Sequence, residues 1–279
     1  MRLSSAPAAA FHRFSSSARL SLWGRSMRPR FADMAYHFGR LVLSVVVIAV
    51  AAHVASMVGM IVGAGLFFLE AFALLHDLAH GALRLPRRIN EIALAFAGTL
   101  LLTSGHAIRR THLVHHARTF GADDIEGRPA REGFWRALFG GPCGALAQRI
   151  QAFRGAGPRG QRWQTVETIA DIAVLSVLVA SGVPALRVYA AVAILAQLTM
   201  GLWASHIPHN APGWLIRMAE RLAWIGSPTV LSLAYHDLHH ARPDVPCRQM
   251  PWIARDHGRA HASLGCVPGA GSRPRLGTA

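Results

Sequence analysis

The residues of this chain best suited to chemistry are histidines, gathered in three short clusters. The clusters occupy residues 76–80, 112–116 and 236–240, with the spacings HxxxH, HxxHH and HxxHH. On a helix, positions i, i+3 and i+4 share one face, so each cluster can aim its imidazoles in one direction. Neutral imidazole binds zinc, copper, iron and nickel. The clusters therefore predict a metal site whose ligands are His76, His80, His112, His115, His116, His236, His239 and His240.

The number of clustered histidines indicates more than one metal ion. Zinc in proteins normally takes about four ligands, so two ions are the economical interpretation of eight imidazoles. The chain has no Glu-x-x-His pair, which is the pattern of carboxylate-bridged di-iron bundles. We therefore expect an all-imidazole site for two metals.

Long apolar runs must position these clusters. The chain is 52% hydrophobic and only 15% charged, whereas soluble domains carry about 25% charged residues. A bilayer crossing takes about 20 apolar residues, and the runs at 41–56, 57–75, 169–181 and 185–205 predict four membrane helices in two hairpins. The run at 89–103 is shorter and predicts an interfacial helix that does not cross. The expected fold is an all-α integral membrane protein with a cytosolic helical cap that carries the metal site.

The placement of arginine predicts the orientation. Both hairpin turns are almost free of basic residues, with Arg187 as the exception, whereas residues 84–88 and 109–162 and both termini are rich in arginine. The positive-inside rule then places both termini and all three clusters on the cytosolic side, consistent with a bacterial inner membrane. If residues 89–103 crossed the membrane, the first two clusters would lie on opposite sides of the bilayer.

The strong positive charge does not indicate a nucleic-acid binder. The formal charge is +15, but every basic residue is arginine, the arginines are dispersed and no recognition motif accompanies them. An anionic membrane surface is the expected partner. We expect residues 1–40 to form a disordered basic extension, 41–255 the membrane domain and 256–279 a disordered tail. The composition of the first 35 residues also resembles a mitochondrial transit segment, and Met27 or Met34 could be the true start.

Residues around the second and third clusters add a family resemblance. Residues 109–116, followed by 123–124, resemble the second histidine box of the membrane fatty acid desaturase and hydroxylase superfamily, and residues 235–240, followed by Pro243 and Pro246, resemble its third. The resemblance covers roughly residues 40–255. Members of the superfamily hold two iron ions and use dioxygen and two electrons to break an unactivated C–H bond.

The resemblance implies a function and partners. It implies desaturation or hydroxylation of an acyl chain in lipid metabolism, with the eight clustered histidines as iron ligands and His206 or His209 as a further nitrogen ligand. The sequence has no flavin, haem or iron–sulfur motif. The electrons must then come from an external donor, such as a ferredoxin or a cytochrome and its reductase, docked on the arginine-rich face.

Several acids are candidates to orient the ligands. A metal-bound histidine usually donates its other N–H to a carboxylate or carbonyl. Four acids lie next to the clusters and are expected to do this, namely Asp77, Asp123, Asp124 and Asp237. Glu70 precedes the first cluster by about two helical turns but falls off the face of its histidines. For Glu70, Asp171 and Gln197, hydrogen bonding between helices is as good an interpretation as a role beside the metals.

The remaining candidates have plainer interpretations. Three cysteines form no disulfide framework and no cysteine-based metal site, and Cys247 is expected to be a packing residue. We expect His12, His37, His257 and His261 to be solvated, His53 to lie far from the clusters and His106 to lie in a loop. The tryptophans at 203, 214, 224 and 252 are expected to be interfacial anchors.

Two other functions stay open. Residues 76–81 and the pair Pro208 and His209 also look like carotenoid ketolases or hydroxylases of the same superfamily, although the extra histidines that ketolases usually carry before the last pair of the third box are missing. An alternative of another class is a non-catalytic membrane protein that binds a metal such as zinc. It leaves the match of three spaced clusters unexplained.

Overall fold

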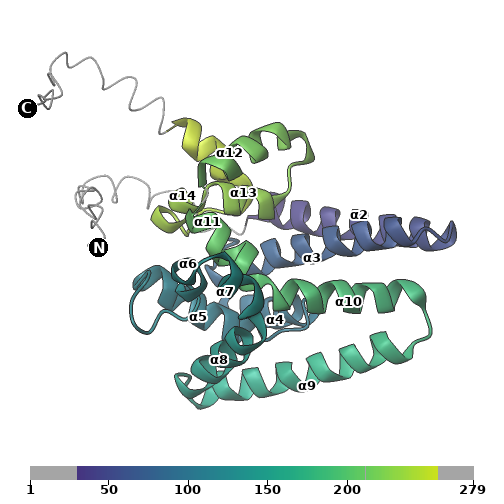
Figure 1. The fold of residues 1–279 in the computed structure, drawn as a ribbon, viewed down its shortest axis with the longest axis horizontal. Coiled ribbons are helices and arrows are strands. Elements are labelled where there is room, and N and C mark those ends of the chain that lie inside the picture. Colours follow the sequence, from purple (N-terminus) through teal and green to yellow (C-terminus); the bar gives the residue numbers. More distant parts are fainter. Residues whose placement is uncertain (1–29, 211, 257–279) are drawn as a thin grey trace, which may run out of the picture.

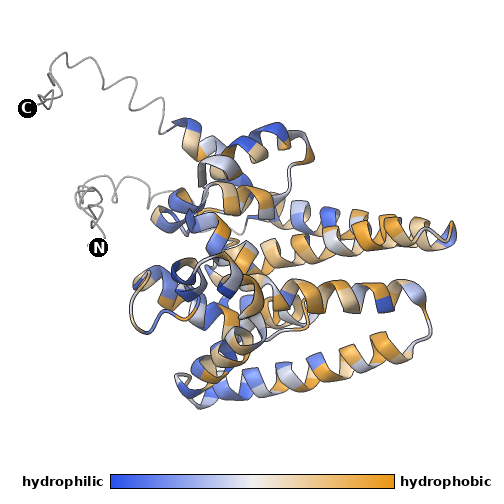
Figure 2. Ribbon diagram, in the orientation of Figure 1, coloured by the Kyte–Doolittle hydropathy of each residue, from blue (hydrophilic) through white to orange (hydrophobic). Residues whose placement is uncertain are grey.

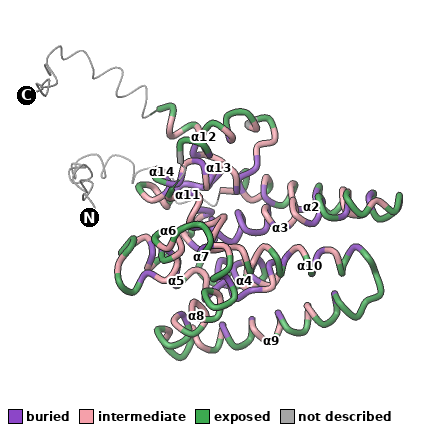
Figure 3. The backbone as a smooth tube through the Cα atoms, viewed as in Figure 1, coloured by how far each residue is buried: buried purple, intermediate pink, exposed green. Residues whose placement is uncertain are grey.

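The computed structural model describes residues 30–210 and 212–256, and these residues form helices without any β-strand. The expected all-α class is confirmed. Two long helical hairpins project in the same direction, and the short helices gather at the opposite end (Figure 1). The hairpin helices are hydrophobic over much of their length (Figure 2), and much of this surface is exposed (Figure 3).

The first hairpin pairs α2 (Phe31–His53) with α3 (Met57–Ala79). Ser56 caps α3 by accepting a hydrogen bond from the amide of Gly59 at 3.1 Å. A Cβ atom on Gly63 would lie 2.7 Å from the side chain of Ile48, so glycine allows the two helices to pack closely. Helix α2 begins ten residues before the apolar run does, so residues 31–40 belong to a helix and not to a disordered extension.

The second hairpin pairs α9 (Pro158–Ala180) with α10 (Pro184–Leu198). Its turn is at residues 181–183, as the sequence predicts, and Gly182 has a φ of +71° there. Helix α10 continues into a short π-helix, η1 (Gly201–His206), and then α11 (Ile207–Asn210). The direction changes by 51° at this break.

The short apolar run forms α4 (Arg87–Leu100), which turns sharply into α5 (Gly105–Ala117). The two helices meet at 102°. A Cβ atom on Gly105 would lie 2.2 Å from the carbonyl oxygen of Leu94, so only glycine fits this corner. Tyr189 and Gln197 of α10 donate hydrogen bonds to the carbonyls of Leu100 and Leu101, which ties the corner to the second hairpin.

Three of the described helices are long and apolar enough to cross a membrane, namely α2, α3 and α9. The two bent pairs, α4 with α5 and α10 with η1 and α11, raise the number to five if each pair is one span. The chain therefore has the helices of an integral membrane protein.

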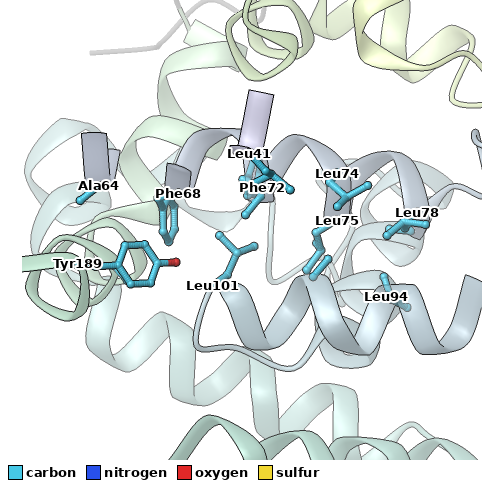
Figure 4. Packing of buried hydrophobic residues seen from close by; sticks show 14 of the residues in the cluster. Leu41, Ala64, Phe68, Phe72, Leu74, Leu75, Leu78, Leu94, Leu101 and Tyr189 are labelled. Carbon is cyan, nitrogen blue, oxygen red and sulfur yellow. The ribbon is translucent and has the colours of Figure 1, made fainter. Parts of the chain in front are cut away.

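The core surrounds α3, which packs against α2, α4 and α10. Figure 4 shows Phe68, Leu75 and Leu101 among the buried side chains of this cluster. Trp203 contacts Phe72 edge-to-face with ring centroids 4.8 Å apart, and its indole N–H donates to the carbonyl of Ala196. Trp203 is thus a packing residue and not the expected anchor. The other three tryptophans that were expected to be anchors, Trp214, Trp224 and Trp252, are exposed.

The short helices form two layers at the end of the bundle. The connection after α5 contains α6 (Arg128–Glu132), α7 (Phe134–Phe139) and α8 (Gly141–Arg154). The cap, which we define as residues 207–249, contains α11, α12 (Pro212–Arg221), η2 (Ala223–Ile225), α13 (Pro228–Ala234), α14 (His236–Ala241) and η3 (Cys247–Gln249).

Polar contacts hold the cap on the first hairpin. The guanidinium of Arg40 pairs with Glu70 at 2.9 Å and donates to the carbonyl of Ile225 at 2.6 Å. The hydroxyls of Tyr36 and Ser227 add hydrogen bonds to the Gly226 carbonyl and to Glu70. Glu70 therefore joins α2, α3 and the cap, which agrees with the interpretation of interhelical hydrogen bonding. Asp171 on α9 similarly pairs with Arg149 of α8 at 3.0 Å.

Candidate metal centre

The three histidine clusters meet at the end of the molecule opposite the hairpin turns (Figure 1). The first lies at the end of α3, where His80 is the C-cap, the second lies on α5 and the third on α14. The rings of His76 and His239 are 4.3 Å apart between centroids, and those of His80 and His116 are 4.5 Å apart. Residues that lie up to about 160 positions apart in the chain thus form one cluster of imidazoles.

The cluster divides into two groups of four, each with one nitrogen per histidine within 4.8 Å of the others. We call the first the core group; it consists of His76, His80, His112 and His239. We call the second the cap group; it consists of His115, His209, His236 and His240. Four converging nitrogens are the ligand set of one metal ion, so the arrangement has room for two.

The two groups draw on different parts of the fold. Three members of the core group come from the C-terminal end of α3 and from α5, and only His239 comes from the cap. In the cap group the proportion is reversed, because only His115 comes from α5. Helices α5 and α14 therefore each contribute to both groups.

His116 lies between the two groups. Its Nε2 is 3.0 Å from the Nε2 of His239 in the core group, and its ring stacks on that of His240 in the cap group at 4.1 Å. It is the member of the second box that contacts both groups.

Of the two candidates that follow α10, the structure brings only His209 to the cluster. The Nε2 of His209 lies 3.2 Å from that of His115 and 3.0 Å from that of His236. The ring of His206 instead faces the carbonyl of Pro129, with its Nδ1 at 3.2 Å. His206 is the last residue of the π-helix and His209 lies in α11, and their side chains have different surroundings.

Carboxylates orient two of the histidines on α5. The Nδ1 of His115 donates to Asp124 at 2.8 Å, and the Nδ1 of His112 donates to Glu126 at 2.5 Å. A carboxylate on Nδ1 leaves Nε2 free to face the group. Asp124 was expected in this role. Glu126 was not, although it stands two residues further along the same acidic segment, and that proximity was the available signal.

Two of the other three predicted acids do not hold an imidazole. Asp123 is exposed and pairs with Arg118 at 2.5 Å. Asp237 is exposed on α14, and no hydrogen bond joins it to an imidazole within the described residues. Both corrections have the same cause, because adjacent residues in a turn or a helix point to different sides and only one of them can face the cluster.

Burial and hydrogen bonds set the charge of the two orienting acids. Burial alone would raise the pKa of Asp124, but hydrogen bonds from His115 and from the amides of Gly127 and Phe120 lower it below its ordinary value. Burial raises the pKa of Glu126 to about 7. Asp124 is therefore a fixed anion, and Glu126 is close to its midpoint at neutral pH.

Most imidazoles of the cluster suit a metal ion because burial keeps them neutral, whereas the hydrogen bond to Asp124 raises the pKa of His115. Burial and neighbouring imidazoles lower the pKa of His236 and His239, and they lower that of His240 to about 3. The buried Nε2 atoms of His80 and His112 have no hydrogen-bond partner among the described residues. Unpartnered nitrogens that face other neutral imidazoles are the donors that a cation needs. The residues therefore fit two metal ions.

A comparison with protein families agrees with this geometry. The family model for fatty acid desaturases matches residues 51–263, which include all three histidine clusters and His209. The chain belongs to the fatty acid desaturase family. No curated protein and no solved structure matches it. Membership supports a membrane-bound enzyme of desaturase or hydroxylase type that uses metal ions.

An apolar cavity of about 340 Å³ opens beside the centre of this desaturase-family chain. This volume lies within the range of small-molecule sites, roughly 300–1,000 Å³. His76, His112 and His236 line one part of it, and Phe72 and Ile108 adjoin them. Residues of α7 and α8 also line the cavity. An apolar ligand in the cavity would therefore contact both groups of imidazoles.

Two histidines that the sequence places in solvent or in a loop are buried. His37 is fully buried on α2, where it hydrogen-bonds Asp77 at 3.0 Å, because α2 extends alongside the end of α3. His106 lies in the first turn of α5, between Glu167 at 2.7 Å and Glu91 at 3.1 Å. His53 is exposed at the end of α2, whereas His12, His257 and His261 lie outside the described residues.

The end of α3 also receives a contact from the far end of the cap. Asp77 accepts hydrogen bonds from the amide of Cys247 at 3.1 Å and from its thiol at 2.9 Å. The Sγ atom lies 3.2 Å from the Nδ1 of His76. Burial and the neighbouring Asp77 raise the pKa of the thiol. Cys247 is buried, as expected of a packing residue, but it also contacts a histidine of the core group.

Proposed function

We propose that this chain is a membrane-bound di-iron oxidoreductase that uses dioxygen and two electrons to desaturate or hydroxylate an acyl chain in lipid metabolism. One observation carries the proposal. Two groups of four imidazoles lie side by side and share an apolar cavity. A buried apolar site beside two metal positions suits a substrate that offers only C–H bonds.

The core group would hold one iron and the cap group the other, with His116 between them. Iron held there would activate dioxygen, which is the oxidant that breaks a methylene C–H bond. Imidazole is a neutral ligand, so it leaves the positive charge of the ions uncompensated. Such a site favours anionic species derived from oxygen and differs in this respect from carboxylate-bridged centres.

The residues around the ligands fix how the imidazoles point. Asp124 and Glu126 keep the proton of His115 and His112 on Nδ1, so that Nε2 faces the metal position. Glu126 also lines the cavity.

The cavity positions the substrate. Phe72, Leu75 and Ile108 provide apolar walls that exclude water from the region next to His76 and His112. A methylene held against these walls is presented to both groups, and the depth to which the chain enters selects the carbon that reacts. Exclusion of water also protects reactive species from side reactions.

Topology supports a centre on the cytosolic side. The α4–α5 pair bends by 102° and returns the second box to the side of the first, which suits a helix pair that does not cross. With α2, α3, α9 and α10 as the four crossings, all boxes lie at the end rich in arginine, where the positive-inside rule places the cytosol. An acidic electron donor, such as a ferredoxin or a cytochrome, would dock there.

The test compares lipids and pigments in cells that express the chain with those in cells that express His115→Ala. We expect new unsaturated or hydroxylated acyl chains and about two irons per purified chain, both reduced by the substitution. Keto- or hydroxy-carotenoids without altered acyl chains would replace the acyl substrate by a carotenoid. A single tightly bound zinc without oxygen-dependent turnover would overturn the proposal in favour of a metal-binding protein.

A further inference from the structure

A chain of polar contacts passes behind the first histidine box. It begins at His37 on α2, continues through Asp77 on α3 and the thiol of Cys247 in η3, and ends at the Nδ1 of His76. His37 and Cys247 are fully buried, and Asp77 is 1% exposed. These residues lie 40 and 170 positions apart in the chain, so the tertiary fold alone creates the arrangement.

The directions of the hydrogen bonds follow from the groups present. Asp77 is a carboxylate and can only accept, so the thiol, 2.9 Å from Oδ1, must donate its proton to it. The amide of Cys247 and the Nε2 of His37 also donate to Asp77, at 3.1 and 3.0 Å. The sulfur lone pairs are then free to accept the Nδ1–H of His76 at 3.2 Å, within the range for a sulfur acceptor.

His76 is therefore held differently from the histidines on α5. His112 and His115 each donate Nδ1–H directly to a carboxylate. The carboxylate nearest to His76 is Asp77, whose Oδ1 is 3.7 Å from Nδ1, too far for a hydrogen bond. The sulfur of Cys247 is closer to Nδ1, at 3.2 Å, and it also contacts Oδ1 of Asp77 at 2.9 Å.

We propose that Cys247 is a positioning residue of the metal centre: its thiol fixes the tautomer and ring orientation of His76 and transmits the anchoring of Asp77 to it. The inference rests on the proposed function, because His76 is taken to be a ligand. Partners of this kind usually change metal affinity or activity by 10–100-fold when they are removed.

A separate metal site formed by His76, Asp77 and Cys247 fits the contacts less well. Their ligand atoms lie within 4.8 Å of one another. Asp77, however, already accepts hydrogen bonds from His37 and from both the amide and the thiol of Cys247. An ion would have to displace the thiol proton and break these bonds, whereas a hydrogen-bonded thiol satisfies every group as it stands.

The experiment titrates the metal-free, full-length protein in detergent with Co²⁺ and follows visible absorption, which reports the ligand geometry of each ion. Three variants are compared with the unsubstituted chain. Cys247→Ala removes both hydrogen bonds of the side chain, and Cys247→Ser retains a donor and an acceptor. Met250→Ala is the matched control. Met250 is as buried as Cys247 and follows η3, and its truncation removes more volume but none of the hydrogen-bonding atoms named above.

We expect Cys247→Ala to weaken one of two binding events by 10–100-fold and to leave the other unchanged. Cys247→Ser should recover most of this loss, and Met250→Ala should bind both ions normally. Equal binding by Cys247→Ala and the unsubstituted chain would overturn the proposal. So would an equal loss in Met250→Ala, because packing would then explain the effect.

The outcome stays decisive if Cys247→Ala does not fold. Cys247→Ser replaces sulfur by oxygen beside His76, and it should shift the Co²⁺ band of one site only; an unchanged band overturns the inference. Failure of the proposed function has a different signature. In that case the unsubstituted chain binds two ions with this dependence on residue 247 but yields no oxidised lipid in cells.

Discussion

The two groups of imidazoles offer the same donor atoms but rest on different parts of the molecule. The core group takes three of its four histidines from the end of α3 and from α5. The cap group takes three of four from α11 and α14, which have only four and six residues. Helices this short are not stable by themselves, so tertiary contacts must position their side chains.

The supports of the two groups differ accordingly. His76 and His80 follow directly on Leu74, Leu75 and Leu78 of the packed core. The cap instead depends on a small apolar cluster and on the polar contacts of α2 and α3 with residues 225–227. We conclude that packing places one metal position and that the docking of the cap places the other. Each of the following predictions tests this division.

The largest effect is expected from removal of one ligand in each group. His239→Ala should empty the core position, His240→Ala should empty the cap position, and either should abolish product because the proposed reaction uses both ions. His206→Ala is the control, since its ring faces Pro129 and not the cluster. Metal analysis of the purified variants and lipid profiles of the cells check this. A loss of metal from the control equal to that from the ligand variants would contradict the assignment.

The orienting acids come next. Glu126→Gln acts on His112 of the core group and Asp124→Asn on His115 of the cap group. Each should weaken metal binding at its own position by about 10–100-fold. Asp123→Asn, which changes an exposed neighbour, should have no effect. Titration of each metal-free variant with Co²⁺ measures the two positions separately. If either variant weakened both positions equally, the two groups would not be independently supported.

A smaller effect, on stability, is expected from the contact that holds the cap. Arg40→Ala leaves Glu70 buried without its ion pair, and loss of one partner of such a pair costs about 3–5 kcal/mol. The cap position should lose affinity more than the core position, because α11 and α14 move with the cap. Thermal unfolding in detergent and Co²⁺ titration measure the two effects, with exposed Arg88→Ala as the control.

The smallest effect is a dependence of stability on pH. The pKa of His240 is lowered to about 3 in the folded protein, from an ordinary value of about 6.5. Below about pH 6.5 the unfolded chain therefore binds a proton that the folded chain refuses, so stability decreases as the pH falls. The loss is about 1.4 kcal/mol per pH unit for this residue.

His240→Gln should reduce this pH dependence in the metal-free protein, whereas His53→Gln, at an exposed position, should not. Thermal unfolding between about pH 4.5 and 7 measures it. Equal slopes for the His240→Gln variant and the unsubstituted chain would show that the cap imidazoles are not shielded from water.

Local pattern was enough to predict much of the fold and the ligand set. Apolar runs predicted the helices of both hairpins, and the i, i+3 and i+4 spacing predicted which histidines share a face. The contacts of Cys247, His37 and Glu126 could not be predicted in this way, for one reason. Their partners are Asp77 and His76 on another helix, or His112 across a turn, and no periodicity links such residues.

The sequence by itself determined that the chain is helical and membrane-inserted and that it carries three imidazole boxes, because these properties depend on neighbours within a few turns. Only the tertiary structure decided how the imidazoles divide into a core group and a cap group, that His209 joins them while His206 does not, and which acids orient them. These outcomes depend on the bend after α10 and on the docking of the cap against α2 and α3, which bring side chains together across more than 100 residues.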